Sequence, residues 1–302
     1  MTNDIKVRCV APVGDHCGEG ATWSAAEQAI YWTDVCRFLV HRMIIATGAV
    51  ESWFFDEPCV ALALTDRPGT LVLGLGSQVI LWEPASDRRT DYGFVLEGAP
   101  GVRLNEGGAG PGGEFWIGSM SNNVGPNGEH GGVTSYEGAL FRLSHDAPAR
   151  TVRRDIGISN TLCFSPDQRF MYFGDSLRNV IWRYDYDPVG GSISGETPFF
   201  EGFARGGPDG SAIDAEGYLW NCRFGGGCVV RVAPDGSVDR VIEMPVSNIT
   251  TCEFGGPDLK TLYVTTAASL LDHHEQFAGS LFALEVSVRG GPAYHHRLGP
   301  QA

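Results

Sequence analysis

The stretch Asp209-Gly-Ser-Ala-Ile213 is followed by the turn-like Asp214-Ala-Glu-Gly217 and by the strand-like Leu219-Trp220. This order of features recurs along the chain: an oxygen-bearing residue, a small or apolar residue four positions later, a turn and an aromatic run. The other copies start at Glu19, Asn105 and Asn160. Short apolar runs separated by Gly, Pro, Asp and Ser clusters are typical of β-strands joined by tight turns. The pattern therefore indicates a repeating all-β architecture.

Two further segments, starting at Val60 and Thr250, keep the same register, although their first residues carry no carboxylate or amide. The six starting positions, here called the anchors, are Glu19, Val60, Asn105, Asn160, Asp209 and Thr250; they are 41, 45, 55, 49 and 41 residues apart. Periods of roughly 40–50 residues with about four strands each are typical of propeller blades. The 41 glycines and 17 prolines, spread throughout, disfavour long helices. We predict a six-bladed β-propeller with a central metal site.

Length alone would allow 302 residues to form two domains. Closed all-β folds often reach this size as one domain, and neither a Pro/Ser-rich linker nor a shift in composition divides the chain. We therefore expect one β-propeller domain over residues 1–302. The apolar runs at residues 7–10 and 293–296 are expected to pair with blade strands and close the ring, which would protect the sheet edges.

Composition restricts the class of function. A formal net charge of −14 disfavours nucleic-acid binding, which needs clustered Lys and Arg. The sequence shows neither a signal-peptide pattern nor an apolar run long enough to cross a membrane. The eight cysteines contain no CxxC pair, so we expect reduced, mostly buried thiols in a cytoplasmic protein. The acidic surface, with only scattered apolar residues, suggests a monomer or a weak homodimer.

Three anchors, Glu19, Asn160 and Asp209, are candidate metal ligands. If the repeats are related by rotation about an axis, these oxygen-bearing side chains converge on one point. Hard divalent cations prefer such ligands, and two carboxylates balance a 2+ charge. Taken singly, Asp and Asn at strand starts more often hydrogen-bond their own backbone. Their equivalence across the repeats favours the metal site.

Arg103 and Asn105 lie two residues apart, so a strand would point both side chains toward the same channel mouth. We expect them to bind substrate, although Arg103 could instead pair with a buried carboxylate. The glycine-rich residues 121–138 are read as a loop, either a lid over the site or a disordered excursion. From this loop Asn122, Asn123 and His130 are candidates for substrate contact.

Several stretches together resemble the SMP-30/gluconolactonase/regucalcin-like family of sugar lactonases over nearly the whole chain. They include Gly18-Glu-Gly-Ala-Thr-Trp23, Arg103-Leu-Asn-Glu-Gly107, Ile158-Ser-Asn-Thr-Leu162 and Pro208-Asp-Gly210. The resemblance implies a six-bladed propeller with one divalent cation, metal ligands at Glu19, Asn160 and Asp209, and substrate contacts at Arg103 and Asn105. The chain departs from the family pattern at Glu106 and Gly110, where Asp is usual, and at Asn123, where some members have a substrate-contacting Glu.

The sequence thus predicts a carboxylic-ester hydrolase that opens a sugar 1,4- or 1,5-lactone, a small-molecule substrate, to the aldonic acid. Asp209 is the expected general base, Arg103 and Asn105 would orient the ring, and Asn123 would contact its hydroxyls. An oxygen-only ligand set accepts calcium, zinc, manganese, iron or magnesium, so the metal stays open. Two alternatives also stay open: a phosphotriesterase-like or other ester hydrolase, and a non-catalytic calcium-binding regulatory protein.

Overall fold

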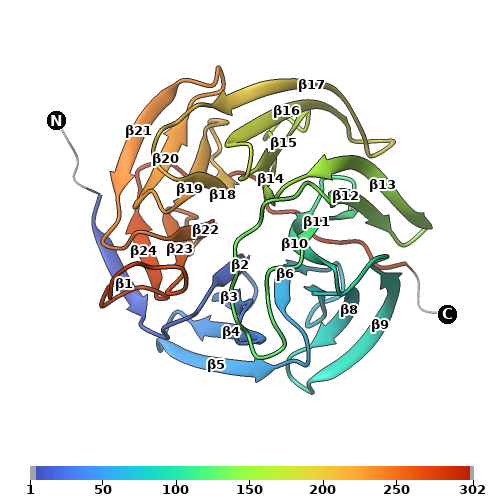
Figure 1. Cartoon of the computed structure of the whole chain (residues 1–302), viewed down its shortest axis with the longest axis horizontal. Coiled ribbons are helices and arrows are strands. Elements are labelled where there is room, and N and C mark those ends of the chain that lie inside the picture. Colours follow the sequence, from blue (N-terminus) through green and yellow to red (C-terminus); the bar gives the residue numbers. More distant parts are fainter. Residues whose placement is uncertain (1–4, 300–302) are drawn as a thin grey trace.

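The computed structural model describes residues 5–299, which form six four-stranded antiparallel sheets arranged around a central axis (Figure 1). The prediction of a six-bladed β-propeller is therefore confirmed. The described residues contain no helix, and so none with the length and apolar character of a membrane span. All eight cysteines are free thiols and seven of them are buried, as expected. That residues 1–302 form one domain stays a prediction.

Each blade runs from an inner strand beside the axis to an outer strand at the rim. Blade 1 contains β2 (Gly18–Ser24), β3 (Ala29–Asp34), β4 (Leu39–Ile44) and β5 (Ala49–Phe54); blade 2 contains β6 (Cys59–Leu64), β7 (Leu71–Leu75), β8 (Gln78–Glu83) and β9 (Arg88–Val95); blade 3 contains β10 (Val102–Ala109), β11 (Phe115–Ser121), β12 (Gly138–Ser144) and β13 (Ala147–Ile156). Blade 4 contains β14 (Ser159–Phe164), β15 (Phe170–Asp175), β16 (Val180–Asp187) and β17 (Ser192–Glu201); blade 5 contains β18 (Gly207–Ile213), β19 (Leu219–Phe224), β20 (Cys228–Val232) and β21 (Val238–Glu243); blade 6 contains β22 (Ile249–Gly255), β23 (Thr261–Thr266), β24 (Leu281–Glu285) and β1 (Val7–Ala11).

The two chain ends behave differently. Strand β1 pairs with β24, so the N-terminal run completes the last blade, as predicted. The prediction for residues 293–296 is wrong, because this segment forms no blade strand and makes only one isolated bridge, between His296 and Thr65. Pro292 has no N–H to donate to a ladder. The C-terminal segment instead crosses one mouth of the central channel.

All six anchors lie on the inner strands, and at all six the strand carries an irregularity. In β10, for example, Asn105 pairs with Gly118 but Gly107 pairs with Ile117, so one extra residue is inserted. The inner strands of the other five blades gain one residue at the same level. A β-bulge bends the strand and re-aims the side chain beside it. The aligned bulges therefore re-aim the side chains at the anchor positions, and the four polar ones, Glu19, Asn105, Asn160 and Asp209, face the channel.

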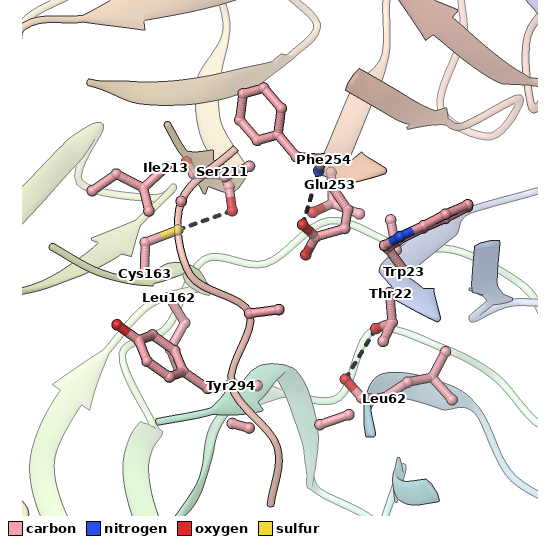
Figure 2. A pocket seen from close by; sticks show the side chains of 18 of the residues that line it. Thr22, Trp23, Leu62, Leu162, Cys163, Ser211, Ile213, Glu253, Phe254 and Tyr294 are labelled. Atoms are coloured by element: carbon pink, nitrogen blue, oxygen red, sulfur yellow. Dashed lines mark hydrogen bonds between the residues drawn. The ribbon is translucent and has the colours of Figure 1, made fainter. Parts of the chain in front are cut away.

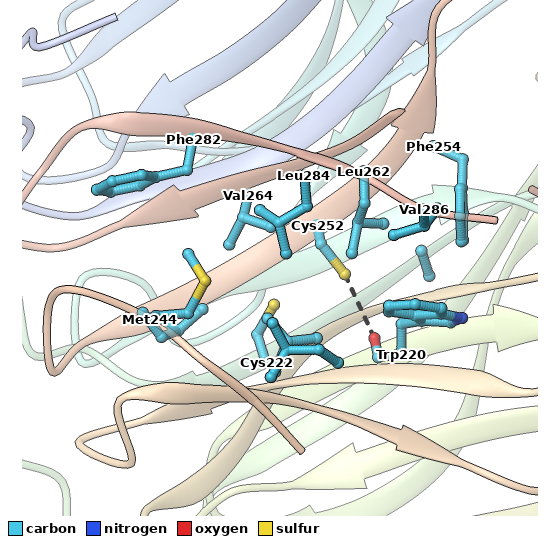
Figure 3. Packing of buried hydrophobic residues seen from close by; sticks show 14 of the residues in the cluster. Trp220, Cys222, Met244, Cys252, Phe254, Leu262, Val264, Phe282, Leu284 and Val286 are labelled. Atoms are coloured by element: carbon cyan, nitrogen blue, oxygen red, sulfur yellow. Dashed lines mark hydrogen bonds between the residues drawn. The ribbon is translucent and has the colours of Figure 1, made fainter. Parts of the chain in front are cut away.

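Apolar side chains fill the space between neighbouring blades. Between blades 5 and 6, Trp220 from β19 meets Phe254 from β22 edge to face, with ring centroids 5.8 Å apart (Figure 3). Met244, Leu262 and Phe282 belong to the same buried cluster. The aromatic side chains of these strands therefore belong to a core between the two blades. Such packing fixes each inner strand relative to the next.

Two buried aspartates hold the entry to the anchor-bearing strands. Asp175, at the end of β15, accepts hydrogen bonds from the backbone N–H groups of residues 157, 158, 177 and 178. Asp34, at the end of β3, does the same for residues 16, 17, 36 and 37. Each carboxylate also pairs with an arginine three residues later. The chain just before Asn160 and Glu19 is therefore fixed by a buried side chain.

The crossing C-terminal segment closes over a cavity of about 160 Å³ at one end of the channel (Figure 2). Residues from all six inner strands line it, together with Tyr294 from the segment itself. The buried His296 anchors the crossing, because its Nδ1 contacts the carbonyl oxygen of Gly113 at 2.9 Å. Inside the cavity, burial raises the pKa of the Glu253 carboxyl to about 7. This end of the channel disfavours negative charge.

The role of Asp175 can be tested by substitution. Asp175→Ala leaves four backbone N–H groups without an acceptor, so we expect the free energy of unfolding to fall by about 3–5 kcal/mol. Arg178→Ala is the control: it removes the partly exposed salt bridge, the bond to the Asp155 carbonyl oxygen and the contact with the Tyr136 ring, but leaves the backbone bonds to Asp175 in place. It should cost clearly less, about 1 kcal/mol. Chemical denaturation measures both values. Equal losses would mean that the ion pair, and not the backbone bonds, carries the effect.

Glu253 predicts a pH dependence of stability. Its folded pKa of about 7 lies above 4.5, the ordinary value for a glutamate, so its ionisation destabilises the fold as pH rises through this window. Glu253→Gln keeps an acceptor for the N–H of Phe254 but cannot ionise. We expect the variant and the parent to be similarly stable at pH 4.5, and the variant to be more stable at pH 8. Parallel denaturation profiles across that range would contradict this account.

Candidate metal centre and substrate pocket

A second cavity, of about 290 Å³, opens at the other end of the channel. It is lined by the six residues predicted to hold the metal or to bind and orient the substrate: Glu19, Arg103, Asn105, Asn123, Asn160 and Asp209. Two anchors do not take part. Val60 packs into the core between blades, and Thr250 donates a hydrogen bond to the carbonyl oxygen of Gly18. The geometry therefore brings together the polar anchors that the sequence predicted to converge.

The two anchor carboxylates are buried in unfavourable surroundings. Burial raises the pKa of Glu19 well above its usual range, and the negative charge of Asp209 raises it further. Burial is also the main cause of the raised pKa of Asp209, followed by the charge of Glu106. Nearby positive charge from Arg103 opposes both shifts only in part. A cation between these carboxylates would stabilise their ionised forms.

Asn160 presents an oxygen without a partner to the same cavity. Its Nδ2 donates to Ser176 Oγ at 2.7 Å, and Ser176 Oγ donates in turn to the carbonyl oxygen of Pro208. This chain of bonds fixes the orientation of the amide. The buried Oδ1 then has no hydrogen-bond partner among the described residues. An unpaired buried carbonyl oxygen is costly unless a ligand satisfies it.

These observations fit a hard divalent cation, which takes oxygen ligands from carboxylates and amide carbonyls. Glu19 and Asp209 would supply charge, and Asn160 Oδ1 would supply a neutral oxygen. No group of three or more His, Cys, Asp or Glu side chains within residues 5–299 is placed to hold a metal. The candidate centre is not such a group, because its third member is an amide.

Arg103 is fixed by two asparagines. Its Nη1 donates to Asn105 Oδ1 at 2.7 Å, and its Nε and Nη2 donate to Asn123 Oδ1 at 2.9 and 2.8 Å. Asn105 is held from its other side, since its Nδ2 donates to the carbonyl oxygen of Ser159. Among the described residues Arg103 forms no salt bridge, so the alternative of a buried ion pair does not apply. These hydrogen bonds fix the orientation of the guanidinium at the cavity wall.

The loop between β11 and β12 runs across this face of the disc, over the channel (Figure 1). It packs against blade 1, where a Cβ on Gly128 would lie 2.0 Å from the carbonyl oxygen of Cys36. His130 Nδ1 contacts Ser269 Oγ at 2.7 Å and so ties the loop to blade 6. Asn123 and His130 line the cavity, as predicted. Asn122 is exposed and instead accepts a bond from the N–H of Val124.

Sequence reasoning gave no role to several lining residues. Only the structure shows that Ser176 orients the Asn160 amide. The apolar wall comes from separate blades and one loop: Met120, Val133, Ile158, Leu177, Phe224 and Leu270. These apolar positions follow no repeat that marks them as functional. The pocket therefore combines a polar side with an apolar side.

Comparison with known proteins identifies relatives of this chain. The family model described as SMP-30/Gluconolactonase/LRE-like region matches residues 17–268. A 6-deoxy-6-sulfogluconolactonase from Pseudomonas putida is 32% identical over 94% of this chain and 96% of its own length. The pentonolactonase XacC from Haloferax volcanii is 32% identical over 93% and 96%, respectively.

A solved structure agrees with these matches. The regucalcin from Agrobacterium tumefaciens, described as a calcium-binding protein, superposes with a TM-score of 0.89 at 28% identity, covering 97% of this chain and 98% of the other. Both sequence and fold therefore agree with the resemblance drawn from the motifs. The chain belongs to the SMP-30/gluconolactonase/LRE-like family.

Proposed function

We propose that this protein is a metal-dependent hydrolase that opens a sugar 1,4- or 1,5-lactone to the aldonic acid. The observation that carries the proposal is the unpartnered Asn160 Oδ1, in the same cavity as the buried Glu19 and Asp209. The two curated relatives that are named lactonases, each 32% identical over nearly the full length, support an enzyme of the carboxylic-ester hydrolase class. A cavity of about 290 Å³ suits one sugar ring.

Glu19, Asn160 and Asp209 would hold a divalent cation, whose chemistry there is to polarise the lactone carbonyl and stabilise the developing oxyanion. Asp209 acts as the general base, since it retains a second carboxylate oxygen to take a proton from the attacking water. Water adds to the carbonyl carbon, the bond to the ring oxygen breaks, and that oxygen receives the proton. The acid product then releases a proton into solution at neutral pH.

The remaining polar residues bind and orient the substrate. Arg103 presents a fixed N–H donor, and Asn105 and Asn123 hold the guanidinium in place. The loop that carries Asn123 and His130 covers the pocket and restricts the access of bulk water. Holding the lactone beside the base lowers the entropic part of the barrier. Whether this loop moves as a lid stays a prediction, as do a cytoplasmic location and a monomeric or weakly dimeric state.

A calcium-binding regulatory role is the second candidate, because the regucalcin relative is described as a calcium-binding protein. It would require the cation site but not the substrate side of the pocket. The presence of Arg103 and Asn105 on the wall of a sugar-sized cavity favours the enzyme. Other ester electrophiles on the same site, phosphotriesters included, are distinguished by substrate profiling.

The proposal predicts metal-dependent lactone opening. Chelated protein should release no protons above background from a panel of aldonolactones, and restoring one divalent cation at a time should recover the activity. A pH indicator in weak buffer measures the release, with phosphotriesters and simple esters as the comparison panel. Tight cation binding without faster opening of any lactone would refute the enzyme and favour the regulatory role.

Asp209→Asn tests the assignment of the base. The amide keeps the shape and one ligand oxygen but cannot take a proton, so kcat at saturating cation should fall by about 10²–10⁴-fold. Glu253→Gln, which neutralises a carboxyl at the other end of the channel, is the matched control and should keep kcat within about twofold at pH 7. A folded Asp209→Asn protein with the kcat of the parent would remove Asp209 from this role.

A further inference from the structure

Arg103 is an arginine in an unusual state: its side chain is buried and has no carboxylate partner. The residue is 5% exposed. Its four protein hydrogen bonds reach three oxygens, those of the Asn105 and Asn123 side chains and the carbonyl of Leu104. A guanidinium has five N–H donors. One N–H of Nη2 therefore has no acceptor among the described residues, and the side chain lines the open cavity.

Two other buried arginines, Arg231 and Arg223, lie outside this pocket. Arg231 pairs with the carboxylates of Asp214, Glu216 and Asp239. Arg223 is 1% exposed and lacks a carboxylate; its hydrogen bonds reach five oxygens and leave one N–H of Nη1 without an acceptor within residues 5–299, but it does not line the pocket. Arg103 differs from both because its hydrogen bonds reach only three oxygens and its side chain lines the cavity in which a substrate would bind.

Asn123 holds the Arg103 guanidinium in place without supplying a negative charge. Its Oδ1 accepts two hydrogen bonds from Arg103, and its Nδ2 donates to the carbonyl oxygen of Gly131 at 2.9 Å. The amide is thereby fixed in orientation with its oxygen on the guanidinium. A carboxylate in this place would neutralise the positive charge, whereas the amide only positions it. The charge of Arg103 stays available to the pocket.

The surroundings strengthen an interaction with an anion. Ile158, Leu177 and Phe224 contribute apolar surface to the cavity wall. Burial also lowers the pKa of Arg103, so its charged form is held at a cost that an anionic partner would offset. A charge-assisted hydrogen bond in such a site is roughly twice as strong as a neutral one.

We propose that Arg103, left without a counter-charge by Asn123, selects a sugar lactone that carries an anionic substituent away from the reacting carbonyl. A sulfonate, a phosphate or a carboxylate satisfies this chemistry. The inference rests on the proposed lactonase function, in which the charges of Glu19 and Asp209 are balanced by the divalent cation. The polar side of the pocket then has one positive charge left for the substrate.

The first test compares matched lactones on the parent protein. A six-carbon aldonolactone and its analogues with a terminal sulfonate, phosphate or carboxylate are hydrolysed under one set of conditions. We expect kcat/KM to be at least about tenfold higher for at least one anionic lactone than for the neutral one. Equal or lower values for all three anionic lactones would overturn the inference while leaving the lactonase intact. No hydrolysis of any lactone would instead remove the proposed function itself.

The second test adds a negative charge beside Arg103. Asn123→Asp keeps the oxygen on Arg103 but adds the missing counter-charge, so the ratio of anionic to neutral kcat/KM should fall by about tenfold or more. Asn122→Asp is the matched control, because it adds the same charge one residue away on an exposed side chain that keeps its bond to Val124. Its ratio should stay within about twofold of the parent.

The ratio of anionic to neutral kcat/KM distinguishes an effect of charge on substrate selection from a general loss of activity caused by a disturbed loop. Asn123→Asp loses the bond from Nδ2 to the carbonyl oxygen of Gly131, which lowers the activity on neutral and anionic lactones alike. A proportional loss on both substrates, or an equal fall in the ratio for Asn122→Asp, would contradict a role for Asn123 in charge selection. A fall confined to Asn123→Asp supports it.

Discussion

The structure depends on one constraint: six inner strands approach a common axis, and each inserts one extra residue at the same level. An ordinary strand would alternate its side chains between the two faces of the blade. The bulges re-aim the side chains at the anchors, four of which, Glu19, Asn105, Asn160 and Asp209, line the channel. Residues as far apart in sequence as Glu19 and Asp209 therefore share one cavity. The buried carboxylates of Asp34 and Asp175 hold the chain where two of these strands begin.

The channel has a cavity at each end, and the two cavities hold different polar groups. One end collects Glu19, Asn160 and Asp209 beside Arg103, and these groups have incomplete partners within the protein. The other end is crossed by the C-terminal segment, and its cavity is lined by many apolar side chains together with the carboxyls of Glu106 and Glu253 (Figure 2). Unsatisfied polar groups cost stability, and folded proteins keep them where a ligand offsets the cost. The apolar core between the blades fixes the positions of the inner strands that carry these polar groups.

Much of the fold and part of the site were predictable from the sequence, because the repeat period and the anchors can be read directly from the order of residues. The blades and the clustering of the four polar anchors follow from that period. Arg103 follows from the alternation of side chains along a strand, and Asn123 is a candidate only through its loop and the family resemblance. The bulges are not visible, since one inserted residue leaves the local composition unchanged. The placement of residues 293–296 failed because Pro292 interrupts the pairing that their apolar character suggested. The different roles of Asn122 and Asn123 depend on backbone direction in an irregular loop, which periodicity does not encode.

The central claim is that the converging anchors form a cation site. Anomalous diffraction from crystals of manganese-loaded protein tests it most directly, because the signal marks the ion itself. The account predicts one peak at the channel mouth, within about 2.0–2.6 Å of oxygens from Glu19, Asn160 and Asp209. No ordered peak at saturating manganese, or a peak bound only by other residues, would contradict the account.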